Sequence, residues 1–425
     1  METLNINHFA GLKEAKIEIG SITLIIGQQA TGKSVTAKLI YFFREIGFQI
    51  TAATIAGRGI EEFKNDCKTK FCRYFPPDSW PPRNFSIVYT NNHEKVCVEY
   101  NHDEGKSPTI VLSLSAFYEE CLVKFSKRWG ELSSKVPEGD PVKKEEARRQ
   151  FHKEIFETLD AKLGKWSKFQ QIFIPAGRAI VSFLQASVFR TLESGQDLDP
   201  FLISFGAFVE ESKAMLFERR FLQTGRDRSE GVKAFQKMLS TVINGDFKRV
   251  KGQDSLSYAD GRRVRLAQAS SGQQEVLPLL FVLGRFISRR HVSGRSVYIE
   301  EPEAHLFPAT QRAIVEFMAS TYRARQEEMC LVITTHSPYI LTAMNNLLQA
   351  GKKYSSSPNP EAKKQLEKII PSSQALYPGE VKAYSLENGE AKSIICPDTN
   401  LIDAEIIDVV SQDIAVQFDD LLEDL

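Results

Sequence analysis

A single octapeptide limits the fold of this chain more than any other stretch. Residues 27–34 follow the apolar run Ile22–Ile26 and precede the apolar, helix-forming run 35–42. A glycine-bounded loop between a strand and a helix presents backbone N–H groups and the positive end of the helix dipole to phosphate groups. The residues expected to bind the phosphates of a nucleotide are Gly27, Gln28, Gln29, Ala30, Thr31, Gly32, Lys33 and Ser34.

The residue types of this loop predict separate roles. Gly27 and Gly32 permit backbone geometry that a Cβ atom would obstruct. Lys33 is expected to reach the β- and γ-phosphates, and the Ser34 hydroxyl is expected to ligate Mg²⁺. The alternative is an accidental glycine-rich turn, and the strand–helix setting argues against it.

Composition excludes several classes of protein. A chain of 425 residues holds about two or three domains, or one core with insertions. Lys plus Arg and Asp plus Glu both number 54, so no overall field draws the chain to nucleic acid or membrane. The six cysteines lack C-x-x-C spacing, and no secretory signal or long apolar run is visible. We therefore expect reduced thiols in a cytoplasmic protein without a membrane span.

Periodicity predicts an α/β architecture for the first part of the chain. A long helix is expected to follow the phosphate loop to about Gly47, and a helical hairpin of two short arms to cover 115–164. Residues 51–82 are poorly periodic. An antiparallel sheet is expected beside the parallel one. The expected strands are 3–9, 14–19, 21–26, 85–90, 95–101, 109–114 and 168–175.

The second part of the chain is expected to carry helices, a small group of strands and a tail. Residues 179–243 form a helical, lid-like segment with a polar break at 194–197, and 242–267 return to strands that turn at Asp260-Gly261. Residues 353–360 look like a loop. The expected divisions are a nucleotide-binding lobe (1–178), the helical segment (179–243), a lobe with further motifs (244–395) and an acidic tail (396–425).

Two carboxylates end the apolar strand Val297–Ile299. Glu300 is expected to hold Mg²⁺, and Glu301 to polarise an attacking water molecule. An exposed acidic turn is the alternative, because glutamates mostly lie on surfaces.

Two more motifs lie at places where ligands bind. Ser270–Gln274 opens an apolar helix, whose hydroxyls and free N–H groups would form an anion site or a simple N-cap. His336 follows the buried strand Cys330–Thr335. The carboxyl ends of strands in an open α/β sheet are where ligands bind, although a lone histidine is more often structural.

The order of these motifs resembles that of the ABC-type ATPases, including their RecF and SMC relatives. The resemblance implies a P-loop NTPase fold with a mixed sheet core, an antiparallel β subdomain and helical insertions. It also implies ATP and Mg²⁺ at two sites shared by a head-to-tail homodimer or a higher homo-oligomer. Ser271, Gly272 and Gln273 would then contact the nucleotide of a second subunit, and His336 would be the γ-phosphate switch histidine, as a catalytic residue beside Glu301.

The sequence departs from that family at two places. Glu300 stands where the family usually has an aspartate, and the signature reads Ser-Ser-Gly-Gln-Gln rather than Leu-Ser-Gly-Gly-Gln. Gln170 and Gln171 are both candidates for the family's Q-loop glutamine.

Two further runs resemble a narrower group. The runs Glu-Glu-Pro-Glu-Ala-His-Leu-Phe-Pro (300–308) and Ile-Pro-Ala-Gly-Arg (174–178) are similar to those of OLD-like and bacterial anti-phage defence ATPases. The stand-alone ATPase subunit of PARIS-type or Septu-type systems is the implied relative.

Three kinds of ATPase compete: a sensor or scaffold that controls a separate, nuclease-like effector, a RecF-like DNA-binding ATPase, and an ATPase with its own nuclease. Only 89 residues follow His336, too few for the Toprim domain that the third kind requires. A transporter subunit fits the insertions poorly. The helical hairpin is too short for an SMC coiled coil and suits a partner or oligomer contact. We therefore expect the sensor or scaffold.

Local charge leaves two alternatives open. Basic clusters would line a nucleic-acid groove or, as we favour in a chain of balanced charge, form a solvated face. The tail from Asp398 has an apolar stripe that would pack on its own domain, as we favour, or dock on a partner. The basic residues are Arg219, Arg220, Arg226, Arg228, Lys248, Arg249, Lys251, Arg262, Arg263, Arg265, Arg289 and Arg290.

Overall fold

The structure is a computed structural model of the chain. It describes residues 1–101, 109–137, 139–183, 199–217, 230–250, 253–288, 294–356, 359–403, 416–418 and 421.

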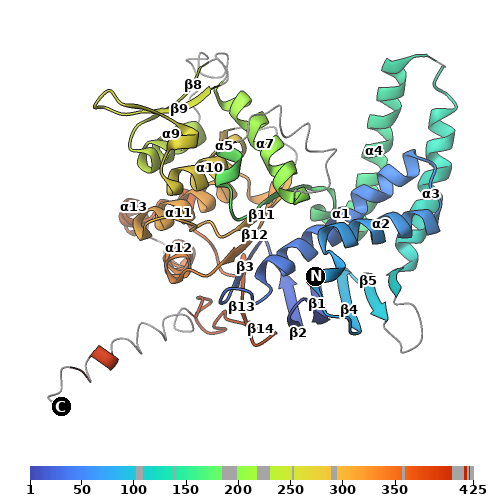
Figure 1. Cartoon of the computed structure of the whole chain (residues 1–425), viewed down its shortest axis with the longest axis horizontal. Coiled ribbons are helices and arrows are strands. Elements are labelled where there is room, and N and C mark those ends of the chain that lie inside the picture. Colours follow the sequence, from blue (N-terminus) through green and yellow to red (C-terminus); the bar gives the residue numbers. More distant parts are fainter. Residues whose placement is uncertain are drawn as a thin grey trace.

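A mixed sheet of eleven strands runs through the described part of the molecule, in the order β6-β5-β4-β1-β2-β14-β13-β3-β12-β11-β7 (Figure 1). Three further strands form a small sheet in the order β10-β9-β8. The strands of the large sheet are β1 Glu2–Phe9, β2 Leu12–Ile19, β3 Ile22–Ile26, β4 Phe85–Asn91, β5 Glu94–Asn101, β6 Thr109–Leu114, β7 Gln170–Ile174, β11 Arg295–Glu300, β12 Met329–Thr335, β13 Val381–Glu387 and β14 Glu390–Ser393. Those of the small sheet are β8 Asp246–Val250, β9 Gln253–Ser257 and β10 Arg263–Arg265.

The large sheet has a parallel half and an antiparallel half. β13, β3, β12, β11 and β7 pair in parallel, whereas β2, β1, β4, β5 and β6 pair antiparallel. β14 joins the halves, since it pairs antiparallel with β13 and parallel with β2. The antiparallel strands expected from the sequence are therefore present, but they continue the parallel sheet instead of standing beside it.

Helices cover both faces of the parallel strands. In Figure 1, α1–α4 lie on one side of the sheet and α9–α13 on the other, and the α3–α4 hairpin projects from the body. The helices are α1 Lys33–Ile55, α2 Ile60–Tyr74, α3 Ala116–Ser133, α4 Pro141–Leu163, α5 Ala179–Phe183, α7 Pro200–Phe217, α9 Glu230–Ile243, α10 Ser271–Ser288, α11 Pro308–Ala324, α12 Pro338–Ser356 and α13 Pro360–Ile369.

Alternating side chains of the parallel strands enter two separate cores. In β11, Val297 and Ile299 pack with α7 and α9–α12, while Tyr298 packs with α1–α4. The same alternation places Leu24 of β3 in the first core and Ile25 in the second. Successive residues of a strand point to opposite faces, so a continuous apolar run is what a sheet covered on both faces requires.

The first helices differ from the prediction. α1 does not end near Gly47 but continues to Ile55. Gly47 lies inside the helix, at the point where α4 packs closely against it. A Cβ atom at Gly47 would lie 3.3 Å from the Leu159 side chain. The stretch taken as poorly periodic contains α2, whose buried residues Phe63, Cys67 and Phe71 recur every fourth position. That spacing was a helical signal that the neighbouring prolines and aromatic residues obscured.

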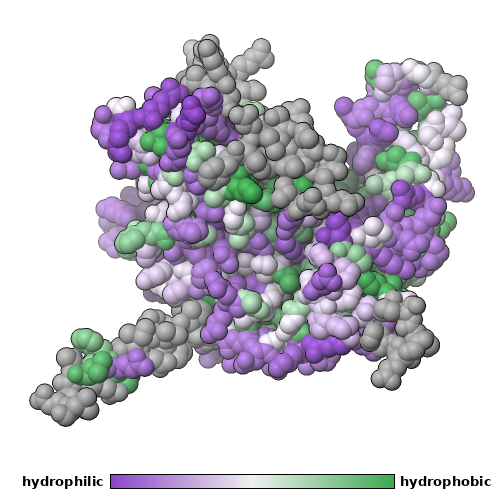
Figure 2. All heavy atoms as spheres, viewed as in Figure 1, coloured by the Kyte–Doolittle hydropathy of each residue, from purple (hydrophilic) through white to green (hydrophobic). Residues whose placement is uncertain are grey.

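The chain after His336 also departs from the prediction. β13 and β14 were not expected, and α12 extends to Ser356 within the stretch taken as a loop. Ile402 is buried, and Asn345 of α12 exchanges two hydrogen bonds with its backbone, so the start of the acidic tail packs on its own domain. The rest of the tail lies outside the described residues, except for a short stretch whose exposed apolar side chains stand clear of the body in Figure 2, namely Val416, Phe418 and Leu421.

A buried ion pair closes the amino edge of the parallel strands. Arg44 of α1 donates from Nε and Nη2 to the two carboxylate oxygens of Glu2, both at 2.6 Å. Its Nη1 donates to Ser296 Oγ of β11 at 3.3 Å and to Cys330 Sγ of β12 at 3.2 Å. The Tyr89 hydroxyl also donates to Glu2. One guanidinium thus links α1 to three strands of the sheet.

Removing this guanidinium should destabilise the fold. Arg44→Ala leaves the Glu2 carboxylate buried without its counter-charge, so we expect the free energy of unfolding to fall by about 3–5 kcal/mol. Urea denaturation would measure it. The control is Arg149→Ala, which removes an exposed partner of Glu145 and should change stability by less than about 1 kcal/mol. Equal effects of the two substitutions would contradict the buried role of Arg44.

Candidate active site

The phosphate loop lies between β3 and α1, and two neighbouring segments constrain its glycines. A Cβ atom at Gly27 would lie 2.5 Å from the Leu386 carbonyl oxygen of β13. Gly32 has φ +95°, and a Cβ there would lie 2.9 Å from the Leu12 side chain of β2. Both positions therefore require glycine, for the close approach at Gly27 and for the left-handed backbone at Gly32.

The amino end of α1 is suited to an anion. Gly32 caps the helix without a side-chain acceptor, and the first turn of α1 contains no acidic residue. Gln28, Gln29, Ala30 and Ser34 are exposed, whereas Thr31 donates from its hydroxyl to the Gln28 carbonyl oxygen at 2.9 Å. The first N–H groups of a helix have no partner within the helix, so phosphate oxygens can accept from them.

The Lys33 ammonium is held over this loop. Its Nζ donates to the carbonyl oxygens of Gly27 at 2.7 Å and Gln28 at 2.5 Å. Burial lowers the pKa of Lys33, and the carboxylates of Glu301 and Glu303 oppose that shift by raising it. The ammonium therefore lies in the field of the acids that follow β11.

Strand register brings the predicted motifs to one edge. Thr335 of β12 pairs with Ile26 of β3, and Glu300 of β11 pairs with Thr334 of β12. The phosphate loop, His336 and Glu301 each follow the last residue of one of these strands. Because β12 lies between β3 and β11, the phosphate loop and Glu300 stand about 10 Å apart, a gap that side chains, a phosphate and a metal ion can span.

The three acids of the Glu-Glu-Pro-Glu turn have different surroundings. Glu300 is buried, and its Oε2 accepts from the Ala176 N–H at 3.0 Å. Glu303 is buried as well, and its Oε1 accepts from the Thr335 hydroxyl at 2.6 Å and from the His336 N–H at 2.8 Å. Glu301 is the most open of them, with 30% of its side chain exposed and a backbone φ of +43°.

His336 lies against two of these acids. Its Nδ1 is 3.4 Å from Glu303 Oε1 and 3.8 Å from Glu301 Oε1, and 41% of the side chain is exposed. One side of the imidazole thus faces the carboxylates while the ring stays accessible. The structure therefore brings together Glu301 and His336, as a γ-phosphate contact beside a water-activating acid would require.

The expected metal ligands can be tested on unsatisfied polar atoms. Glu300 Oε1 and Glu303 Oε2 are buried and accept no hydrogen bond within the described residues. A buried carboxylate oxygen without a partner is costly, and Mg²⁺ or its bound water would satisfy it. Ser34 is exposed at the start of α1, where its hydroxyl is free to reach an ion. Ser34 and Glu300 therefore fit the group that the sequence predicts.

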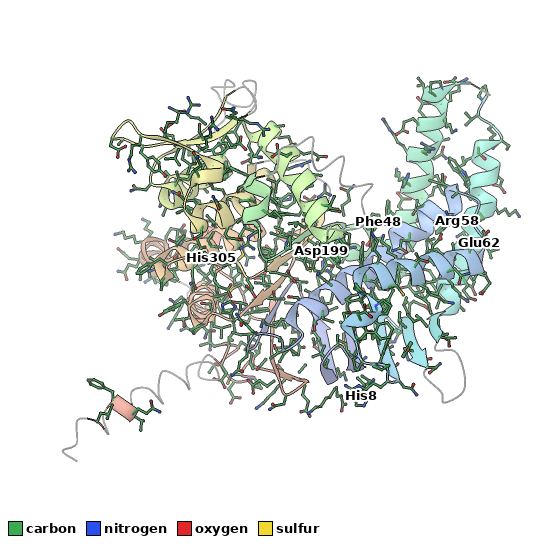
Figure 3. All side chains as sticks on the ribbon, viewed as in Figure 1. His8, Phe48, Arg58, Glu62, Asp199 and His305 are labelled. Atoms are coloured by element: carbon green, nitrogen blue, oxygen red, sulfur yellow. The ribbon has the colours of Figure 1, made fainter. Side chains whose placement is uncertain are left out.

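The signature residues lie at the start of α10, beside the acidic turn. A Cβ atom at Gly272 would lie 2.7 Å from the His305 carbonyl oxygen, so this glycine permits the contact. Figure 3 shows His305 beside α11, which follows the acidic turn. Within the described residues no hydrogen bond or ion pair joins Ser271, Gly272 or Gln273 to the phosphate loop.

Gln273 is engaged by its own chain. Its Oε1 accepts from the Ser270 N–H at 3.2 Å, and its Nε2 donates to the Ile243 carbonyl oxygen at 3.1 Å and to the Tyr258 hydroxyl at 3.3 Å. Ser271 is exposed. The hydroxyl of Ser271 is thus accessible at this end of α10, as is that of the exposed Ser270 before it.

Neither candidate Q-loop glutamine lies near the phosphate loop. Gln170 and Gln171 begin β7, where they pair with Arg295 and Ser296 at the start of β11. Gln171 donates to the Tyr41 carbonyl oxygen at 3.1 Å and accepts from the Tyr298 hydroxyl at 2.6 Å. Parallel strands run in one direction, so both glutamines lie at the amino edge, opposite the site.

Arg178 stands near the carboxyl end of β7 instead, and its role was not deduced from the sequence. The side chain is fully buried, and Nη1 donates to the Glu300 carbonyl oxygen at 2.6 Å. Burial lowers the pKa of Arg178, while Glu275, Glu303, Glu300 and Glu301 oppose that shift. The Ile-Pro-Ala-Gly-Arg run was the sequence signal that pointed to Arg178. Glu303 was also missed as a site residue, although it is the third acid of the Glu-Glu-Pro-Glu turn.

One family model matches part of the chain. The family model described as an AAA ATPase domain matches residues 207–341, which contain α10, β11, the three acids, β12 and His336. No curated protein matches the chain.

Several solved structures are similar over most of their length. The SMC head domain from Thermotoga maritima is 12% identical with a TM-score of 0.32, and the alignment covers 92% of this chain and 97% of that one. The Smc head domain from Pyrococcus furiosus, solved with an extended coiled coil and the C-terminal domain of ScpA, is 13% identical with a TM-score of 0.34, covering 97% and 99%. A dimeric bacterial ABC transporter cassette is 10% identical with a TM-score of 0.34, covering 92% and 97%.

The fold class predicted from the sequence is confirmed. The described part of the chain has an α/β fold with a mixed sheet core, antiparallel strands and helical insertions, as the sequence predicts for a P-loop NTPase of the ABC type. The matched family supports an ATPase. Of the helices in the described part, none combines the length and apolar character needed to cross a bilayer.

Lys33 should be required for nucleotide binding, because it supplies the loop's full positive charge. Lys33→Ala is expected to abolish ATP binding, measured by titration calorimetry, without unfolding the protein. Lys38→Ala is the matched control, since Lys38 lies on the same helix and pairs with Asp199 at 2.9 Å, at the start of α7 (Figure 3). ATP affinity like that of the wild type in Lys33→Ala would refute the assignment.

Glu301 should matter for turnover and not for binding. Glu301→Gln keeps the shape and removes the charge, so ATP affinity should persist while the hydrolysis rate falls by roughly 10²–10⁴-fold. Phosphate release under saturating ATP would measure this rate. Glu300→Gln is the comparison and should instead weaken Mg²⁺-dependent ATP binding. If Glu300→Gln spares binding and stops turnover, the two roles are reversed.

Proposed function

We propose that this protein hydrolyses ATP and uses the ATP-bound assembly of its subunits to control a separate effector protein. The observation that carries the proposal is the convergence of the phosphate loop, His336 and the acids Glu300 and Glu301 at one edge of three adjacent parallel strands. A phosphate-binding loop alone fits any nucleotide-binding protein. The acids and the histidine add the groups that phosphoryl transfer to water needs.

The proposed roles follow from the surroundings of each side chain. Backbone N–H groups of the loop and Lys33 hold the phosphates, and Ser34 and Glu300 hold Mg²⁺, which neutralises phosphate charge. Glu301, the most exposed acid, orients the attacking water, and Glu303 holds the backbone of His336 through its N–H. His336, whose side chain is 41% exposed, would contact the γ-phosphate.

Shared sites follow from the place of the signature residues. Ser271 is exposed at the start of α10, and the described residues give it no contact with the phosphate loop of its own chain. A helix N-terminus that presents N–H groups and a hydroxyl suits an anion brought by another molecule. We therefore assign Ser271, Gly272 and Gln273 to the nucleotide of a second subunit, with two ATP molecules in a homodimer or more in a larger homo-oligomer.

Of the five basic residues of these clusters that the structure describes, Arg249 and Arg262 are paired with acids, whereas Lys248, Arg263 and Arg265 are exposed and form no ion pair in the described part. Arg249 pairs with Glu210 at 2.8 Å and with Asp254 at 3.6 Å, and Arg262 pairs with Asp260 at 2.6 Å. Charges already neutralised by neighbouring acids offer little to a phosphate backbone. The basic residues that lie outside the described part are Arg219, Arg220, Arg226, Arg228, Lys251, Arg289 and Arg290.

The defence role rests on resemblance and on one structural feature. The runs 174–178 and 300–308 resemble those of anti-phage defence ATPases, and both lie in the site around Arg178 and Glu300. The α3–α4 hairpin stands clear of the ATP site and gives the protein a surface that nucleotide binding leaves free (Figure 1). A separate nuclease-like effector in the cytoplasm is the partner that this arrangement suits.

Mixing two inactive variants tests the shared site. A Lys33→Ala subunit lacks its own loop charge but keeps Ser271, whereas a Ser271→Arg subunit has the reverse defect. Each alone should be inactive, and a mixture should regain part of the ATPase activity through one intact composite site. Differently tagged subunits would establish mixed assembly by co-purification. Mixed assemblies without recovered activity would contradict the shared site.

A further inference from the structure

One fully buried side chain joins the signature helix to the acidic turn. The Arg178 guanidinium donates to four backbone carbonyl oxygens from three segments of the chain. Its Nε donates to Glu275 at 3.0 Å, and its Nη1 donates to Pro175 at 3.3 Å and Glu300 at 2.6 Å. Its Nη2 donates to Glu301 at 2.9 Å. A guanidinium can satisfy several acceptors at fixed angles, which an ammonium cannot.

The Glu275 side chain of α10 also binds the backbone at Arg178 and Ala179. Glu275 Oε2 accepts from the Arg178 N–H at 2.8 Å, and Glu275 Oε1 accepts from the Ala179 N–H at 3.1 Å. The guanidinium Nε also lies 3.6 Å from Glu275 Oε2. Glu275 follows Ser271–Gln273 in the first turns of α10. Glu275 and Arg178 thus connect the first turns of α10, which carry Ser271–Gln273, to the acids Glu300 and Glu301 of the same subunit.

The backbone at Glu301 needs such support. Its φ of +43° lies in the left-handed region, which is unfavourable for a residue with a Cβ atom. Three hydrogen bonds hold this backbone: the Glu301 N–H donates to the Thr334 carbonyl oxygen at 2.8 Å, and the Glu301 carbonyl oxygen accepts from the Ala304 N–H at 3.0 Å and from Arg178 at 2.9 Å. The bond from Ala304 lies within the turn, whereas the bond from Arg178 is the one that ties this carbonyl oxygen to β7 and α10, so its loss should let the turn and the Glu301 carboxylate shift relative to α10.

We propose that Arg178 is a positioning residue that fixes the Glu301 carboxylate relative to the signature helix, so that hydrolysis in one site depends on how that subunit's α10 is seated on its neighbour. The inference rests on the proposed function, since it concerns the same hydrolytic site. Arg178 touches the backbone of Glu300 and Glu301 and not the reacting atoms. Its effect is therefore on turnover, through the orientation of Glu301.

Arg178→Lys tests the proposal. Lysine keeps the positive charge beside Glu275 but has three donors on one flexible atom, so it cannot bond all four carbonyl oxygens. We expect kcat to fall by about 10²-fold, as displacement of a catalytic group by about 1 Å does. The Kd for ATP should change by less than about threefold, and ATP-dependent assembly should persist. A lower kcat with a nearly unchanged Kd would indicate a positioning role, whereas a general loss of structure would change both.

Arg44→Lys is the matched control. Arg44 is also a buried arginine, and it contacts β11 and β12 at their amino ends, far from the acids. The substitution should lower the melting temperature yet leave kcat near that of the wild type below the transition. If Arg44→Lys and Arg178→Lys lower kcat equally, or if Arg178→Lys loses ATP binding together with turnover, the positioning role is refuted.

A second variant tests the link between Arg178 and Glu275. Glu275→Gln retains an acceptor oxygen and removes the charge that Arg178 faces, so kcat should also fall. Because both residues act through Glu301, the double variant Arg178→Lys/Glu275→Gln should be no slower than the slower single variant. Multiplicative losses would show independent roles and overturn the inference.

The outcomes also separate this inference from the proposed function. Wild-type protein that assembles but never hydrolyses ATP would refute the proposed function, and the role of Arg178 would fall with it. Normal wild-type hydrolysis with Arg178→Lys within about twofold of its kcat would overturn only the role of Arg178.

Discussion

The parallel pairing of β3, β12 and β11 is the constraint on which the candidate site depends. The three strands end at the same edge of the sheet, and each is followed directly by a segment that carries candidate site residues. Side chains alternate between two apolar cores, so a shift of one residue in any strand would place its apolar set on the wrong face. The cores thereby fix the register, and the register brings together groups that are far apart in the sequence.

The parts of the site that could be predicted from the sequence are those encoded locally. The phosphate loop is one continuous octapeptide with a required strand and helix on either side, and the acids and His336 each end an apolar run. The order of these motifs then predicted the fold class. The prediction failed where a local signal and the tertiary packing disagreed. A glycine such as Gly47 often marks a helix end, but Gly47 lies within α1 at the place where α4 packs against it.

The parts that could not be predicted depend on tertiary contacts. Nothing near Arg178 in the sequence indicates that its donors reach the carbonyl oxygens of Glu275, Glu300 and Glu301. Gln171 was a candidate by residue type alone, and only the direction of β7 places it at the opposite edge. The partners of Glu303 likewise come from the end of β12. Residue identity suggested candidates, whereas strand polarity and burial decided among them.

The contact between Gly27 and Leu386 has a consequence for how the protein is made. The ribosome completes the phosphate loop early. β13 contacts that loop and pairs with β3, but it emerges only after almost every other described strand. Both strands that pair with β3, namely β12 and β13, come late in the sequence, so β3 lacks both neighbours during most of synthesis. The contact of the Leu386 carbonyl oxygen with the loop at Gly27 therefore forms only after more than nine-tenths of the chain has been made.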